Sequence, residues 1–349
     1  MTDATSQDIR LSAIIPNYNH GAFIGRAVDA LLAQSVRPDE IIIVDDASTD
    51  NSRRVIAGLQ DQHPALIRLI THDVNLGAIA ALNRGLTEAR GNYVYFGSAD
   101  DVTHPTLFQA MISLLVTHPE AALACGETRL VDQKGYALGY RPIARPTQNT
   151  SYIAPRRAQS LILTTDHWIL TGASVYRTDH IKSIGGFDAS FGSFADGFAS
   201  KQLALRYGFC FTPRVVADWR IDPDGYSRKS ASDPKDALAI IDKIRVTIAH
   251  DPTFPPQYAE LYARRWRFAV CRLALVSLPF NTSILRSMGG KSSWDRAALE
   301  GLARLRPATL SKMLILVWLT LRLRPTSLIQ VFRTFVSRRN NSPRHTSIN

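Results

Sequence analysis

Apolar runs alternate with segments of helical periodicity from Leu11 to about Cys125. Five short, mainly apolar runs have the length of strands, at residues 11–15, 41–44, 67–70, 93–96 and 121–125. Between them, apolar residues recur three and four positions apart, which predicts helices at residues 23–32, 52–59, 79–89 and 106–116. Strands that alternate with helices indicate βαβ units and a mostly parallel sheet. We therefore expect an α/β fold with a buried central sheet.

The pattern is less regular after this part. Residues 141–157 contain three prolines and predict a loop, whereas residues 174–176 and 209–211 predict strands, the second ending near Pro213. Residues 196–207 predict a helix. A polar segment rich in Pro, Gly and Ser, residues 221–234, suggests a boundary, and the segments after it are helical: 237–249, 256–276, 293–305, 310–321 and 327–337. We expect an α/β domain over residues 1–230 and a helical region over residues 231–349.

Charge is concentrated near the C-terminal end. From Glu260 onward, 16 Lys and Arg face three acidic residues, a net charge of +13, which leaves −2 for the rest of a chain whose total is +11. A cationic region on a near-neutral body suits an anionic surface, either membrane or nucleic acid. No nucleic-acid-binding module accompanies this charge, so we expect no nucleic-acid partner. The alternative is a helical appendage packed on the main domain or on a second subunit.

Cysteine usage and hydropathy suggest the compartment. Cys125, Cys210 and Cys271 are far apart and form no metal-binding or disulfide pattern, which favours a reducing compartment. Residues 1–10 are polar and resemble no signal peptide, and the longest uncharged apolar stretch near the end, residues 313–321, is too short to span a bilayer. We therefore expect a cytoplasmic protein, peripheral at the inner face of the cell membrane if its basic helices bind lipid.

Two predicted strands end in paired carboxylates. Asp45-Asp46 follows the second strand, and Asp100-Asp101 follows the fourth. Parallel strands bring their carboxyl ends to one edge, where open α/β sheets bind ligands. Four carboxylates at one edge favour a hard divalent cation, Mg²⁺ or Mn²⁺, bridged to a phosphate. Alternatively, each pair caps the helix that follows it.

Several motifs in order resemble the family 2 glycosyltransferases, inverting enzymes with a GT-A fold. The resemblance covers about residues 11–230. It is carried by Ala13-Ile14-Ile15-Pro16-Asn17-Tyr18-Asn19, Ile43-Val44-Asp45-Asp46-Ala47-Ser48-Thr49-Asp50, Asn75-Leu76-Gly77, Ser98-Ala99-Asp100-Asp101 and Gly185-Gly186-Phe187-Asp188 followed by Asp196. Each motif alone is a weak signal, whereas their order and spacing together are specific. The resemblance implies nucleotide-sugar binding over about residues 11–125 and acceptor binding over about residues 126–230.

The resemblance also implies roles for individual residues. Tyr18 would pack on the base or ribose, and Asp45 or Asp46 would accept a hydrogen bond from the base, with uracil expected. Asp100 and Asp101 would hold the metal at the diphosphate, and Asp196 would be the general base for the acceptor hydroxyl. The implied nucleotide-sugar-binding residues are Pro16, Tyr18, Asn19, Asp45, Asp46, Asn75, Gly77, Ser98, Ala99 and Asp100.

The chain departs from the family pattern at two motifs. Ser98 stands where the family usually has Asp, and a hydroxyl is a poor metal ligand, so Asp100 is the expected key ligand. Ala195-Asp196 stands where the family often has Glu-Asp. From the residues alone, Asp196 is also a candidate N-cap of the helix at residues 196–207.

Other candidates lie between these motifs. His167 and Trp168 would line the acceptor site, with Trp168 stacking on a sugar, although a buried packing role fits Trp168 equally well. Arg220 would contact the diphosphate, and Asp222 stands near a position where the family often has His. The resemblance thus implies an inverting glycosyltransferase that moves a sugar from a nucleotide sugar, with a UDP-sugar expected, to a glycan or lipid-linked acceptor in cell-surface polysaccharide synthesis. The alternative is a non-catalytic nucleotide-sugar-binding subunit of a membrane-associated assembly, for which Ser98 is the main support.

Overall fold

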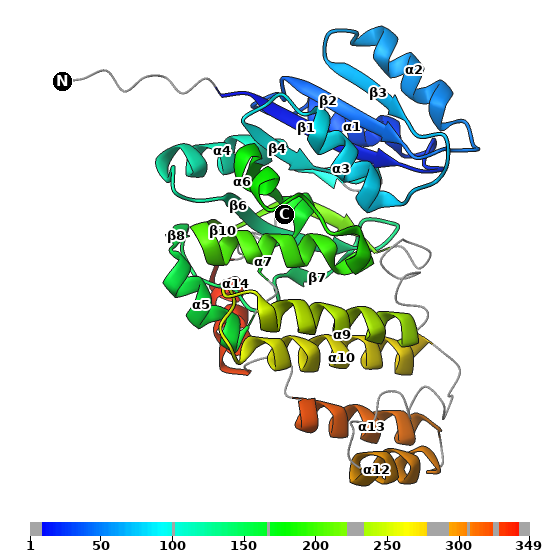
Figure 1. Cartoon of the computed structure of the whole chain (residues 1–349), viewed down its shortest axis with the longest axis vertical. Helices are drawn as coiled ribbons and strands as arrows, with labels where there is room; N and C mark the ends of the chain where they lie inside the picture. Colours follow the sequence, from blue (N-terminus) through cyan, green and yellow to red (C-terminus); the bar gives the residue numbers. More distant parts are fainter. Residues whose placement is uncertain are drawn as a thin grey trace, which may run out of the picture.

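A mixed sheet with helices on both faces forms the body of the molecule, and further helices extend beyond one end of it (Figure 1). The computed structural model describes residues 9–99, 102–165, 168–221, 234–277, 293–305, 308–323 and 328–341.

The first half of the sheet is parallel, as the sequence predicts. Its strands lie in the order β3-β2-β1-β4, with β1 at Leu11–Asn17, β2 at Glu40–Asp45, β3 at Ile67–Thr71 and β4 at Tyr93–Phe96. The helices of this half are α1 Ile24–Leu32, α2 Ser52–Gln62, α3 Ala78–Glu88 and α4 Leu107–Thr117. Asn17 is opposite Asp45 in the register of β1 with β2, so the carboxyl ends of these strands meet at one edge.

The second half of the sheet contains a reversed strand. β9, Ser174–Arg177, lies antiparallel between β4 and β6, Leu123–Val131. The segment before β9 is the 3-10 turn η1, Thr171–Ala173, and the reversal puts it beyond the carboxyl end of β4. After β9 come α6 Thr178–Ser183, η2 Ala189–Phe194 and α7 Ala195–Tyr207.

The remaining strands complete this half. β10, Phe209–Arg220, runs parallel to β6 and antiparallel to β5, Val102–Thr103. β7, Ala137–Arg141, pairs with β6, and β8, Ser151–Ile153, pairs with β10.

Three predictions for this half were wrong, the first being that β6, expected over residues 121–125, is instead Leu123–Val131. β10 does not end near Pro213 but continues to Arg220, and register shifts on both sides of Val215 accommodate a proline that cannot donate to the ladder. Residues 141–157 are not a continuous loop, because they include β8 and the start of α5, Pro155–Thr164. Pro155 suits the first helical turn, where its missing N–H has no intrahelical partner to lose.

Each face of the sheet has its own apolar core. One core packs α1, α2 and α4 against strand residues such as Ile15 and Ile43, and the other packs α3, α5, α7, α9 and α10 against Ile14 and Ile42. Neighbouring strand residues enter opposite cores because successive side chains point to opposite faces. At Gly85, α3 approaches β1 so closely that a Cβ would lie 2.4 Å from Ile14 Cγ2, which requires glycine.

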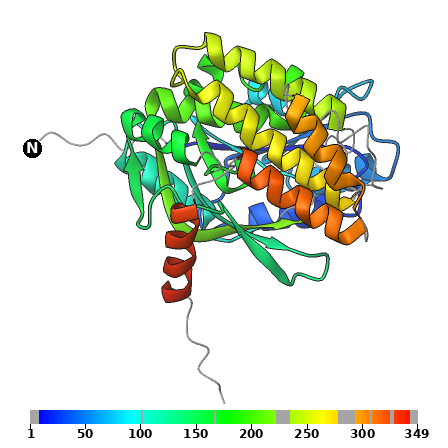
Figure 2. The ribbon, with the colours of Figure 1, turned by 90° about the horizontal axis from the view of Figure 1, so that it is seen from below.

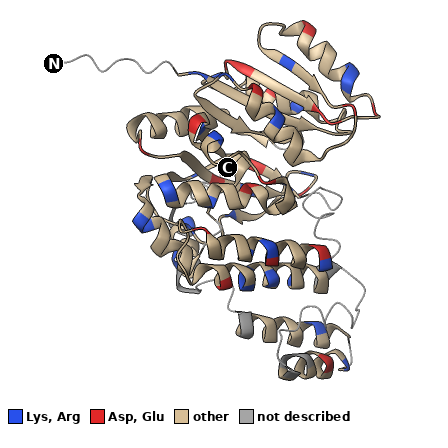
Figure 3. Cartoon of the chain, in the orientation of Figure 1, with Lys and Arg blue, Asp and Glu red and all other residues tan. Residues whose placement is uncertain are grey.

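The C-terminal helices divide into three groups. α9, Pro234–His250, and α10, Tyr258–Ser277, pack into the second core of the sheet, and the expected boundary near residue 230 lies outside the described residues. α12, Ser293–Ala303, and α13, Ala308–Leu323, form a small cluster with the end of α10. α14, Leu328–Asn341, lies apart from them (Figure 2). Lys and Arg recur along α9, α10 and α13 (Figure 3). None of the helices within the described ranges is long and apolar enough to cross a bilayer.

Candidate active site

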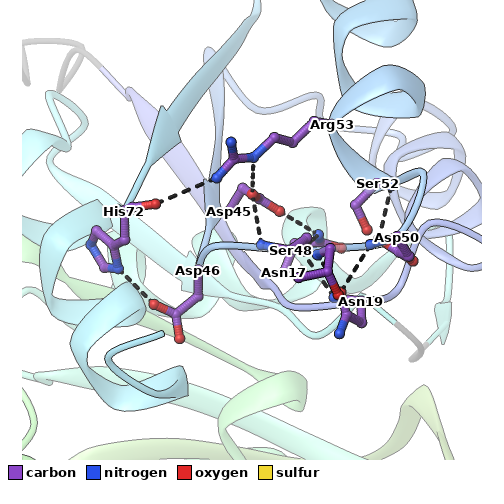
Figure 4. A network of polar contacts seen from close by, with 10 residues as sticks. Asn17, Asn19, Asp45, Asp46, Ser48, Asp50, Ser52, Arg53 and His72 are labelled. Carbon is purple, nitrogen blue, oxygen red and sulfur yellow. Dashed lines mark hydrogen bonds and ion pairs between the residues drawn. The ribbon is translucent and has the colours of Figure 1, made fainter. Parts of the chain in front are cut away.

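Asp45 is a fully buried carboxylate at the end of β2 that organises the loop after it (Figure 4). Its Oδ1 accepts from Asn17 Nδ2 at 2.9 Å, and its Oδ2 accepts from Ser48 N at 3.2 Å and Arg53 Nε at 2.8 Å. Burial alone would raise the pKa of Asp45, but hydrogen bonds from Ser48, Arg53 and Asn17 outweigh it and hold the pKa below its usual range. Asp45 is therefore ionised and committed to protein partners.

Asp46 binds the segment that leads into α3. Its Oδ1 accepts from His72 Nδ1 at 2.7 Å and Leu76 N at 2.9 Å, and its Oδ2 accepts from Gly77 N at 2.7 Å. Asn75 Oδ1 also accepts from Gly77 N, at 3.1 Å. Gly77 has φ 91° and ψ 158°, a conformation that is essentially restricted to glycine. The two neighbouring carboxylates thus serve different elements, Asp45 towards α2 and Asp46 towards α3.

Asn19 fixes the loop between Asp46 and α2. Its Oδ1 accepts from Thr49 N at 2.8 Å and Asp50 N at 3.2 Å, and its own N donates to Ser48 Oγ at 3.0 Å. Asn19 has a left-handed backbone with φ 54°. The preceding Tyr18 is 43% exposed, whereas Pro16 is half-buried within β1. The tyrosine ring is therefore accessible at the carboxyl edge of the sheet.

The acidic motif after β4 is described only in its first half. Ser98 is half-buried and Ala99 is buried. The expected metal ligands Asp100 and Asp101 lie outside the described residues. Within the described ranges, no three His, Cys, Asp or Glu side chains gather into a metal site.

A charged cluster that the sequence analysis missed lies beside this motif. Asp218 on β10 accepts from Arg129 Nε at 2.8 Å and Nη2 at 2.7 Å, and His104 Nε2 lies 3.3 Å from Asp218 Oδ1. Burial raises the pKa of Asp218, but the hydrogen bonds and positive charges of Arg129 and His104 have the larger effect and hold this pKa below its usual value. The cluster joins β6, β10 and the segment after β5, and only the pairing of β6 with β10 brings Arg129 opposite Asp218. Two residues on, Arg220 has a buried Nε with no hydrogen-bond partner among the described residues.

Asp196 is the second residue of α7 and lies in its first turn. Its Oδ2 accepts from Thr171 Oγ1 at 3.0 Å, and its Oδ1 accepts from Gly197 N at 2.6 Å. The N-cap position belongs to Phe194, so Asp196 is not the N-cap that the sequence offered as an alternative.

Thr171 is itself held by a buried network. Tyr176 Oη lies 3.4 Å from Thr171 Oγ1 and 2.9 Å from Ser200 Oγ, and Ser200 Oγ donates to Asp196 O at 2.8 Å. Tyr95 Oη donates to Gly172 O at 3.2 Å, which ties η1 to β4. Asp196 is therefore fixed near the carboxyl end of β4, the strand that leads to Ser98.

One of the two candidate acceptor residues, Trp168, lies in the core. Trp168 is 1% exposed and stacks on Phe209 with centroids 5.6 Å apart. It therefore takes the packing role, and the prediction that it stacks on a sugar was wrong, because its ring belongs to the core under β10. His167 lies outside the described residues.

One helix links the two halves of the site. α3 begins beside Gly77, which is bound to Asp46, and further along it Asn83 Nδ2 donates to Phe187 O at 2.7 Å. Asn83 Oδ1 also accepts from Phe187 N at 2.9 Å. The Asp46 loop and the loop before α7 are thus bonded to the same rigid element.

Comparison with known sequences supports the same family. The profile described as "Glycosyl transferase family 2" matches residues 12–184. An uncharacterized glycosyltransferase of Nostoc sp. is 43% identical over 109 residues, which are 31% of this chain and 34% of that protein. The uncharacterized glycosyltransferase YibD of Escherichia coli K12 is 30% identical over 176 residues, 50% of this chain and 47% of that protein. The matches span about a third to a half of the length of these curated relatives.

Solved structures share the fold at low sequence identity. The complex of Staphylococcus aureus TarS 1–349 with UDP-GlcNAc matches 87% of this chain and 90% of that chain, with a TM-score of 0.60 and 16% identity. The mannosyltransferase PcManGT of Pyrobaculum calidifontis, in complex with GDP-Man and Mn²⁺, matches 95% of this chain and 87% of that chain, with a TM-score of 0.55 and 19% identity. These likenesses confirm the GT-A fold with C-terminal helices. By its sequence motifs, its profile match and its fold, the chain belongs to glycosyltransferase family 2.

Proposed function

We propose that the chain is an inverting glycosyltransferase that moves a sugar from a UDP-sugar to a glycan or lipid-linked acceptor in the synthesis of cell-surface polysaccharide. The observation that carries this proposal is the arrangement of Asp196 and Thr171 at the carboxyl end of β4, in a chain of this family. A carboxylate there faces the edge at which α/β sheets bind ligands.

For the nucleoside, we propose Asp46 as the carboxylate that reads the base. Both carboxylates are buried, but Asp45 is paired with Arg53 on the α2 side of the loop. Asp46 is bonded to the start of α3, the helix that also holds the loop before α7. Its Oδ2 accepts one hydrogen bond from protein and has capacity for a second. Tyr18, with its exposed ring, would stack on the base.

For catalysis, Asp196 would accept the proton of the acceptor hydroxyl, which then displaces the nucleoside diphosphate directly and inverts the anomeric centre. Thr171 fixes one carboxylate oxygen, and the N-terminal end of α7 favours the negative charge. Oδ1 accepts from Gly197 N and retains capacity for a second hydrogen bond.

We assign binding of the diphosphate to Asp100, Asp101 and Arg220. Asp100 and Asp101 supply carboxylate oxygens, which suit Mg²⁺ or Mn²⁺. Such a metal would neutralise charge on the leaving diphosphate. Arg220 supports this assignment, because its buried Nε lacks a partner among the described residues and would be satisfied by a phosphate oxygen.

The test is the substitution Asp196→Asn, assayed by release of nucleoside diphosphate with Mn²⁺ present. We expect kcat to fall by about 10²–10⁴, the usual contribution of a general base, while calorimetry shows UDP binding unchanged. Asp179→Asn, which removes an exposed carboxylate on α6, is the matched control and should keep full activity. If Asp196→Asn turned over like the wild type, the assignment of the base would be rejected.

Ser98 favours one alternative, a non-catalytic nucleotide-sugar-binding subunit, because it replaces a metal-binding carboxylate of the family pattern. Calorimetry with UDP, followed by turnover assays over a panel of donors and acceptors, separates the two. Binding that Mn²⁺ strengthens, without any turnover, would support the alternative.

For the location, we propose the cytoplasm, with peripheral contact at the inner face of the cell membrane. The support is the net charge of +13 from Glu260 onward, which suits anionic lipid headgroups.

A further inference from the structure

α14 is packed on the catalytic domain through its polar face. Thr334 is buried, and its Oγ1 accepts from Arg145 N at 2.9 Å. Ser337 Oγ accepts from Arg145 Nη1 at 3.0 Å, and Arg338 Nη2 donates to Glu127 Oε1 at 2.5 Å and Pro142 O at 2.6 Å. Residues three and four positions apart share one side of a helix, so one polar stripe makes these contacts.

The receiving surface is a buried ion pair. Arg145 Nε donates to Glu127 Oε1 at 2.9 Å and Nη2 to Oε2 at 2.6 Å, and both side chains are buried. Arg338 adds a second cation to the same carboxylate, and its guanidinium lies 5.2 Å from the centre of the Tyr140 ring. Charge-assisted bonds of this kind are directional, so they set the rotation of α14 about its axis.

That rotation turns the apolar side of α14 outward. Phe332 is 67% and Phe335 62% exposed, Val336 is exposed as well, and Arg333 lies exposed beside them. A helix on a soluble protein ordinarily buries its apolar stripe and exposes its polar one, and here the arrangement is inverted. The hairpin of β6 and β7 projects from the body on the same side as α14 (Figure 2), and its Tyr136 and Leu138 are exposed.

The charge of the C-terminal segment selects the partner of this face. Residues 301–349 contain nine Lys and Arg and no Asp or Glu. A second copy of the chain would bring two such segments together, and their like charges would repel. An anionic bilayer attracts the cations and accepts the aromatic side chains at its interface.

We propose that α14 is the element that inserts into an anionic lipid surface, with Phe332, Phe335 and Val336 at the acyl boundary and Arg333 among the phosphates. The inference rests on the proposed function only in the role that it gives to lipid binding, which is to bring the active site to a lipid-linked acceptor. Lipid binding itself requires no catalysis.

The experiment measures partition of the full chain onto sedimenting vesicles of phosphatidylcholine, with or without phosphatidylglycerol. We expect binding to the anionic vesicles alone, weakened by salt. Phe332→Ser/Phe335→Ser should lower this partition at least about tenfold, because two large apolar side chains are lost. Arg333→Gln should lower it about fivefold. The control Val116→Ser/Val246→Ser removes two exposed apolar side chains elsewhere and should bind like the wild type.

The outcomes separate the lipid surface from the catalytic proposal. Hydrolysis of the nucleotide sugar without vesicles should be the same in Phe332→Ser/Phe335→Ser and the wild type. A wild-type chain that binds anionic vesicles but shows no turnover would contradict only the catalytic proposal. Unchanged partition of Phe332→Ser/Phe335→Ser, or absence of wild-type binding to anionic vesicles, would overturn the lipid surface. A dimer in sedimentation velocity that the double substitution dissociates would also overturn it, because the apolar face of α14 would then be buried against a second copy of the chain.

Discussion

Thr171→Val tests whether the hydrogen bond to Asp196 positions the proposed base. Valine has nearly the shape of threonine and lacks only the hydroxyl that donates to Asp196 Oδ2 at 3.0 Å. Tyr176 Oη keeps its 2.9 Å contact with Ser200 Oγ, so the substitution leaves no buried hydroxyl without a partner. The substitution therefore removes the bond to Asp196 and, with it, only the longer 3.4 Å contact from Tyr176 Oη.

The magnitude follows from the kind of bond that is removed. A hydrogen bond to a charged group contributes about 1.5–3 kcal/mol. Asp196 is only half-buried, so water replaces part of the interaction and the lower value applies. Since about 1.4 kcal/mol corresponds to a factor of ten in rate, we expect kcat to fall about tenfold. The KM for the nucleotide sugar should stay within about twofold, because Thr171 is not assigned to donor binding.

The assay is steady-state release of nucleoside diphosphate at saturating acceptor, with two further variants. Thr171→Ser keeps the donor hydroxyl and should retain most of the activity. Thr178→Val is the matched control, because Thr178 Oγ1 is buried without a hydrogen-bond partner among the described residues. An unchanged kcat in Thr171→Val, or an equal loss in Thr178→Val, would refute the reasoning.

Three further predictions concern the nucleoside side of the site. Because hydrogen bonds hold the folded-state pKa of Asp45 below its usual value, its carboxylate stabilises the fold above about pH 4 and loses this effect as the pH falls through the folded-state pKa. Urea denaturation should therefore show Asp45→Asn less stable by about 1–3 kcal/mol at pH 7, with a difference that shrinks below pH 4, and an equal difference at every pH would contradict this. Tyr18→Ala should raise the Kd for UDP by about 5- to 150-fold in calorimetry, since stacking contributes about 1–3 kcal/mol, whereas Tyr18→Phe should bind normally. Gly77→Ala should cost about 1–3 kcal/mol of stability from backbone strain alone, because no atom lies within 4 Å of the added Cβ, and Gly58→Ala, within α2, should slightly stabilise the chain in the same assay.

The sequence predicted best where one periodicity dominates. β4 was predicted with its exact bounds, and β1, β2 and β3 within two residues at either end, because continuous apolar runs between amphipathic helices leave little ambiguity. β10 was predicted too short, since local rules treat Pro213 as a stop and cannot foresee that register shifts in a pairing with β6 will tolerate it. α5 was missed because its proline was counted as a loop signal rather than as a first helical residue.

The candidate site was predictable in its acidic residues but not in their partners. Asp45 and Asp46 follow an apolar strand and are evident in the sequence. Arg53 could have been found at the start of the next helix, as the second residue of α2. His72 and Thr171 could not, because each reaches its carboxylate through strand pairing or strand reversal over 25 residues or more. For Trp168, the sequence could not decide between sugar stacking and packing, because a single aromatic residue does not reveal whether its ring is buried.

The reversed direction of β9 sets the spacing between Ser98 and Asp196, the proposed base. A strand of four residues is about 13 Å long. If β9 ran parallel to β4, η1 would lie at the amino edge of the sheet, about one strand length from Ser98. Thr171 could then not contact a base at the carboxyl edge. The antiparallel strand returns the chain to the edge that β1, β2 and β4 have already reached. An insertion within β9 would therefore change the distance between Ser98 and the proposed base, without changing any residue that we assign to the nucleotide.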